Sequence, residues 1–79
     1  MKKIVRIIDN SLYPKRLVSE TRNAFKQHCL IQAEAIQNNR VKLYFEIINT
    51  QYSESDIVLE FMNYLLELTA MLEMERNDG

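Results

Sequence analysis

Residues 53–75 read SESDIVLEFMNYLLELTAMLEME, and this stretch carries the strongest structural signal in the chain. Its apolar side chains recur every three or four residues, the period that gathers them on one face of an α-helix. The residues assigned to this face are Ile57, Val58, Phe61, Met62, Leu65, Leu66, Leu68, Thr69 and Leu72. Ser53, followed by Glu54 and Asp56, is typical of a helix start. The stretch therefore predicts a long amphipathic helix against which the rest of the chain packs.

A strand and a shorter helix are predicted near the N-terminus. Residues 3–9 alternate as a strand with branched apolar side chains on both faces. We assign Val5 and Ile7 to the core face of this strand, and Ile4, Arg6 and Ile8 to its outer face. Pro14 suits the first position of a helix, where a missing N–H costs nothing, and His28 is expected to close that helix.

The middle of the chain predicts a β-hairpin. Residues 30–36 and 40–48 alternate as strands, and Asn38-Asn39 between them tolerates the positive φ of a type I′ turn. In the second of these strands the residues predicted to face the core are Val41, Leu43, Phe45 and Ile47. Tyr44 and Ile48 fall on its outer face.

The order of these elements is strand, helix, strand, strand, helix. A right-handed crossover makes the first two strands parallel, and the hairpin returns the third strand between them. The sequence therefore predicts one α+β domain over residues 1–79, with a three-stranded sheet in the order 1-3-2 and two helices on one face. This is a ferredoxin-like unit that lacks the fourth strand.

The missing strand predicts a surface for a partner. The first strand has an unpaired edge beside Arg6, and its outer face adds to an apolar patch. That predicted patch consists of Ile4, Ile8, Leu30, Ile36, Tyr44 and Ile48. Three interpretations remain open: a homodimer through the sheet, a peptide added as a strand, or a patch that polar neighbours leave solvated. The candidate partner-binding residues are Ile4, Arg6, Ile8, Tyr44 and Ile48.

A second candidate surface lies on the outer side of the long helix. Asn63, Tyr64, Glu67 and Met71 recur at helical spacing, and methionine offers adaptable apolar contact. This side of the helix either docks on a partner or is solvated. The charge is also uneven: residues 1–42 hold nine of the ten basic residues, whereas residues 43–79 hold eight of the eleven acids. This asymmetry indicates either electrostatic attraction between the two halves of the folded chain or a basic face that binds an acidic partner.

Several classes of function are disfavoured by composition. A single cysteine leaves no internal disulfide, and one His beside one Cys supplies too few ligands for a metal, so neither a metal nor a cofactor is expected. Adjacent His28 and Cys29 point in different directions at a helix end, which disfavours catalysis. The pI near 5.8 and one outer-face aromatic make nucleic acid an unlikely partner. The apolar runs are too short for a signal peptide or a membrane span, so a cytoplasmic protein is expected.

Residues 61–67, FMNYLLE, resemble the F-x-N-x-L-L-D segment of the small accessory D proteins (HxsD) of His-Xaa-Ser peptide-modification systems. Tyr13 before a helix, Ala24-Phe25 near its end and the following hairpin are similar in layout. Glu67 stands where that family has Asp, and the Leu-Arg that closes its motif is absent. The resemblance implies a bacterial, non-catalytic protein that binds a ribosomally made precursor peptide or its radical SAM maturase. The competing interpretation is a homodimeric interaction protein without a peptide ligand.

Overall fold

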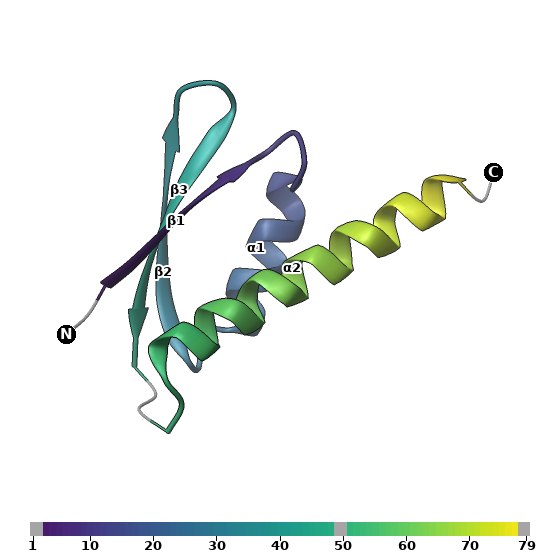
Figure 1. Ribbon diagram of the computed structural model, residues 1–79. Helices are drawn as coiled ribbons and strands as arrows, with labels where there is room; N and C mark the ends of the chain where they lie inside the picture. Colours follow the sequence, from purple (N-terminus) through teal and green to yellow (C-terminus); the bar gives the residue numbers. More distant parts are fainter. Residues whose placement is uncertain (1–2, 49–50, 78–79) are drawn as a thin grey trace.

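The computed structural model describes residues 3–48 and 51–77 (Figure 1). Its elements are β1 (Lys3–Asp9), α1 (Lys15–Ala24), β2 (Cys29–Ile36), β3 (Arg40–Ile47) and α2 (Glu54–Asn77). The sheet order is β1-β3-β2, with β3 antiparallel to both neighbours. Figure 1 shows both helices on one side of the sheet, with α2 nearer β1 and α1 behind it. The predicted α+β fold with an open sheet in the order 1-3-2 is confirmed.

The core lies between the sheet and the two helices, and most of its residues come from β3 and α2. The alternate residues Val41, Leu43 and Phe45 of β3 are buried, as the period of two requires. On α2 the buried residues are Ile57, Val58, Phe61, Leu65 and Thr69, which follow the helical period. The rings of Phe45 and Phe61 meet edge to face, with centroids 5.0 Å apart. This aromatic contact joins the sheet to the long helix.

The two faces of β1 are the reverse of those predicted. Ile8 is only 4% exposed, and Ile4 packs against the core, whereas Val5 and Ile7 are 40% and 52% exposed. The pairing of β1 with β3 sets this orientation, because Ile4 lies opposite Phe45 and Ile8 opposite Val41. Both faces of β1 carry branched apolar residues, so alternation alone could not distinguish them.

Both ends of the predicted first helix and one residue of the predicted long helix also differ from the structure. Helix α1 ends at Ala24, and a turn follows in which Phe25 O accepts from His28 N at 2.9 Å, so His28 does not close the helix. Pro14 has an extended ψ of 143° and precedes the helix as its N-cap. On α2, Leu66 is 54% exposed and does not belong to the buried stripe. An apolar residue beside the buried stripe continues the apolar pattern of the sequence even where no other element packs on it.

The hairpin turn and the β1–α1 connection have clear local causes. Asn38 and Asn39 have φ angles of 64° and 60°, which confirms the predicted left-handed turn between β2 and β3. After β1, the Asp9 carboxylate accepts hydrogen bonds from the amide and hydroxyl of Ser11, at 2.8 and 2.6 Å. These bonds hold the chain in an Asx-type turn as it leaves the sheet.

The same two bonds lower the pKa of Asp9, because they stabilise its charged form. Since the folded pKa lies below the unfolded value of about 3.9, the carboxylate stabilises the fold above that pH. The contribution is lost as the pH falls through the folded pKa. Ser11→Ala is expected to raise the pKa of Asp9 towards its ordinary value, measured by NMR titration of the carboxyl carbon. An unchanged pKa in this variant would contradict the assignment of the shift to Ser11.

Candidate functional site

No strand in the described part of the chain pairs with the outer edge of β1. In an antiparallel ladder, residues that exchange both hydrogen bonds alternate with residues whose main-chain groups point away. Asn10 N donates to Asn39 O at 2.9 Å, one position beyond the pair of Asp9 and Arg40. Every second residue before Asn10 therefore bonds β3 as well, and these residues are Ile8, Arg6 and Ile4. The N–H and C=O groups of the residues between them, Val5 and Ile7, point to the open edge of β1.

Arg6, a predicted partner-binding residue, sits on this edge. It lies opposite Leu43 in the register, on the helix side of the sheet, and its side chain is exposed. Its Nη1 donates to Val5 O at 2.9 Å, which fits an outward-pointing carbonyl. An inward-facing charge on an edge strand discourages indiscriminate pairing. Arg6 therefore partly caps the edge in this structure.

An exposed apolar flank of α2, formed by Leu59, Met62 and Leu66, lies on the same side as this edge. Leu59 and Leu66 are more than half exposed, and Met62 is partly buried. Tyr64 contacts Phe25, just after α1, with ring centroids 5.8 Å apart. At ~100° per residue, Leu66 lies ~200° round the helix from Tyr64, so the flank points away from α1. Figure 1 shows β1 on that side of α2.

The outer face of the sheet carries apolar residues on either side of a polar centre. Val5 and Ile7 take the places expected for Ile4 and Ile8, and Ile48 is 49% exposed at one end. The centre is polar: the Tyr44 hydroxyl lies 3.4 Å from Glu34 Oε1, and Lys42 Nζ lies 5.7 Å from the Tyr44 ring centroid. This polar centre separates the apolar residues of β1 from Leu30 and Ile48. The predicted contiguous patch is therefore interrupted.

The four residues predicted to dock a partner on α2 are all exposed: Asn63, Tyr64, Glu67 and Met71. Of these four, Tyr64 contacts the Phe25 ring in the turn after α1. In Figure 1, the C-terminal part of α2 extends beyond the sheet, and Met71 and Met74 there are 58% and 71% exposed. The structure thus places these side chains on an accessible helix surface, separate from the open edge of β1.

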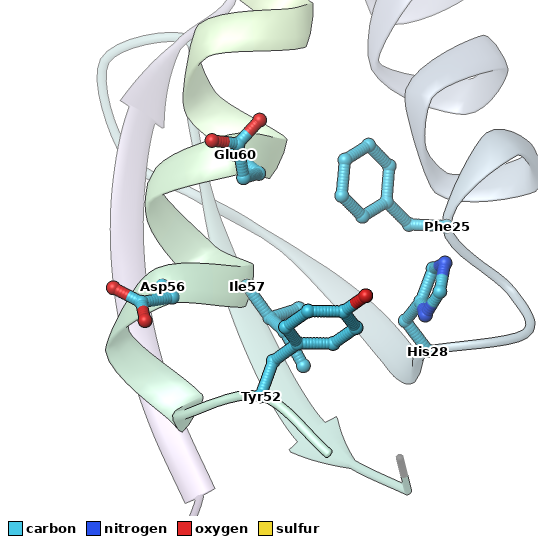
Figure 2. Close-up of a pocket in the computed structure, with 6 residues that line it drawn as sticks. All are labelled: Phe25, His28, Tyr52, Asp56, Ile57 and Glu60. Atoms are coloured by element: carbon cyan, nitrogen blue, oxygen red, sulfur yellow. The ribbon is translucent and has the colours of Figure 1, made fainter. Parts of the chain in front are cut away.

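A shallow pocket of about 280 Å³ lies between the turn after α1 and the start of α2. Figure 2 shows the side chains that line it: Phe25, His28, Tyr52, Asp56, Ile57 and Glu60. The rings of Phe25 and Tyr52 give it largely apolar walls, while the Asp56 carboxylate points away from Phe25 and His28. Neither the Asp56 nor the Glu60 carboxylate points toward the His28 ring in Figure 2.

The His28-Cys29 pair also has a structural explanation. Cys29 is 1% exposed, and its Sγ lies 3.7 Å from Phe25 O, which closes the turn after α1. Burial raises the pKa of the Cys29 thiol, so it stays protonated at neutral pH and is a poor nucleophile. The His28 ring meets Phe25 edge to face at 6.2 Å. Within residues 3–48 and 51–77, no group of three or more His, Cys, Asp or Glu residues could hold a metal.

Comparison with known proteins found no matching family model, no matching curated protein and no matching solved structure. Among the described residues, no helix is long and apolar enough to cross a membrane.

Proposed function

We propose that this protein is a non-catalytic accessory protein that binds an extended peptide as a fourth strand along the open edge of β1. The observation that carries the proposal is the outward direction of the main-chain groups of Val5 and Ile7. Strand addition uses such groups for affinity and the alternate side chains for specificity. The position corresponds to the strand that the sheet lacks.

The side chains around this edge support the same proposal. An added strand would contact Val5 and Ile7 on the outer face of the sheet. On the helix side it would approach the Leu59–Met62–Leu66 flank of α2. Apolar surface on both sides of an edge strengthens a pairing that main-chain bonds alone would leave weak. To pair at Val5, the peptide would displace the Arg6 guanidinium from the Val5 carbonyl.

The resemblance of residues 61–67 to HxsD supplies the class of ligand. It favours a ribosomally made precursor peptide, or the radical SAM maturase that modifies it, as the bound partner. The exposed residues Asn63, Tyr64, Glu67 and Met71 offer a second surface for the maturase while the peptide occupies β1. In this proposal the maturase performs the chemistry, and the present chain positions the peptide.

A homodimer formed through the outer sheet face is the competing function. The exposure of Val5, Ile7, Leu30 and Ile48 favours it. The polar centre around Tyr44 weighs against it, because a paired sheet would have to bury Lys42 and Glu34. Light scattering distinguishes the two: a tight dimer indifferent to peptide would support the homodimer and contradict the peptide-binding proposal.

The direct test is a titration of the ¹⁵N-labelled protein with a short repeat-bearing peptide of the kind that the proposed class would encode beside its gene. We expect the largest amide shift changes at Val5 and Ile7, because their N–H groups would gain partners. Shift changes confined to α1 and α2 would contradict strand addition at β1. Adjacent genes for a radical SAM enzyme and a repeat-bearing peptide would support the proposed class.

A further inference from the structure

The other edge of the sheet forms a groove between α1 and β2. The groove has a volume of about 270 Å³, slightly below the ~300–1,000 Å³ typical of small-molecule sites. It is lined by Asn10, Lys15, Val18, Ser19, Arg22, Ala33, Ala35 and Val41. Ala33 and Ala35 lie opposite the buried residues Leu43 and Val41 of β3, yet both are exposed. Their small side chains leave space beneath α1 that larger residues would fill.

The main chain of β2 also points into solvent at this edge. Ile48 N donates to His28 O at 3.0 Å, one position beyond the pair of Cys29 and Ile47. By the alternation of an antiparallel ladder, the N–H and C=O groups of Ile31, Ala33 and Ala35 therefore face away from β3. The Ile31 carbonyl already accepts from Arg22 Nη2 at 2.7 Å. The groups of Ala33 and Ala35 remain for an added strand.

The groove is basic. Lys15 and Arg22 stand on α1 at its rim, and no acidic residue is among the described residues that line it. Glu34, the acid on the adjacent position of β2, lies on the outer face next to the Tyr44 hydroxyl. The bond to Ile31 O holds the Arg22 guanidinium in place, and four of its five N–H donors remain for a ligand. The Arg22 N–H groups that a carboxylate would bind are therefore already oriented.

We propose that the α1–β2 groove binds an extended peptide segment bearing a carboxylate side chain. The main chain of this segment pairs with Ala33 and Ala35, and its carboxylate lies between Lys15 and Arg22. Small apolar side chains two positions away occupy the space above the two alanines, since alternate residues of a strand face the same side. This site is at the opposite edge of the sheet from β1 and does not depend on the function proposed there.

Two blocked heptapeptides test the proposal: Thr-Val-Thr-Glu-Thr-Val-Thr, and the same sequence with Gln in place of Glu. Titrated into the ¹⁵N-labelled full chain at low salt, the Glu peptide is expected to shift the amides of Ala33 and Ala35. It should bind about fivefold more tightly than the Gln peptide, as one partly exposed ion pair provides. Lys15→Met/Arg22→Met should bring this ratio to about one. The matched control Arg16→Met/Lys26→Met removes the same charge from α1 and the turn after it, outside the groove, and should preserve the ratio.

Each other outcome overturns the proposal in a distinct way. Equal affinities of the two peptides for the wild-type protein, or a ratio that survives Lys15→Met/Arg22→Met, would remove the carboxylate selectivity. Shifts confined to Val5 and Ile7 would place the peptide at β1, which leaves the proposed function intact and overturns the groove. Shifts of Ala33 and Ala35 that follow protein concentration without peptide would assign the groove to a second copy instead.

Discussion

Replacing Phe61 with alanine is expected to cost about 3–5 kcal/mol of folding free energy, the usual range for a fully buried phenylalanine. Phe61 is fully buried and meets the rings of both Phe45 and Phe25 edge to face, at 5.0 and 5.5 Å. Its removal would leave a cavity where the sheet, α2 and the turn after α1 meet. A domain of this length has about 4–12 kcal/mol of stability in total, so the variant would be close to unfolding.

Urea denaturation followed by circular dichroism measures this loss. Leu66→Ala, five residues further along the same helix, is the matched control, because Leu66 is 54% exposed. We expect it to change stability by no more than about 0.5 kcal/mol. If Phe61→Ala unfolded at nearly the wild-type urea concentration, the packing centre described here would be wrong.

Replacing Ile7 with proline is expected to weaken peptide binding at least about tenfold, which corresponds to about 1.4 kcal/mol. The Ile7 N–H points to the open edge of β1, so proline removes a donor to the added strand and takes no bond from β3. The proline ring also occupies the space next to that edge. Isothermal titration with the same repeat-bearing peptide measures the change.

Ile7→Val is the control for this experiment. Valine keeps the N–H group and an apolar β-branched side chain, so binding should stay within about twofold of the wild type. Urea denaturation of both variants would separate a loss of binding from a loss of folding. Undiminished binding by a folded Ile7→Pro variant would show that the peptide does not pair with β1.

The open edge of β1, the candidate site for a peptide, could be predicted from the sequence only in part. The order of the elements already implied an unpaired edge on the first strand. Which β1 residues face it depended on the register with β3, and this register placed Ile4 and Ile8 on the core side instead of the outer face. The α1–β2 groove was not predicted, although Ala33 and Ala35, small residues at alternate positions of a strand, were a signal for it.

The apolar period of 3.6 residues determined the long helix, and the period of 2 determined the strands of the hairpin. Each period places the apolar side chains on one face only in the corresponding secondary structure. Asn38-Asn39 determined the turn for a similar local reason, since asparagine tolerates a left-handed backbone. Only the tertiary structure decided which side of β1 is buried and where Arg6 and Arg22 reach the edges of the sheet. Those features depend on contacts between elements that are distant along the chain. The local sequence of a strand that is apolar on both faces does not indicate which face will be buried.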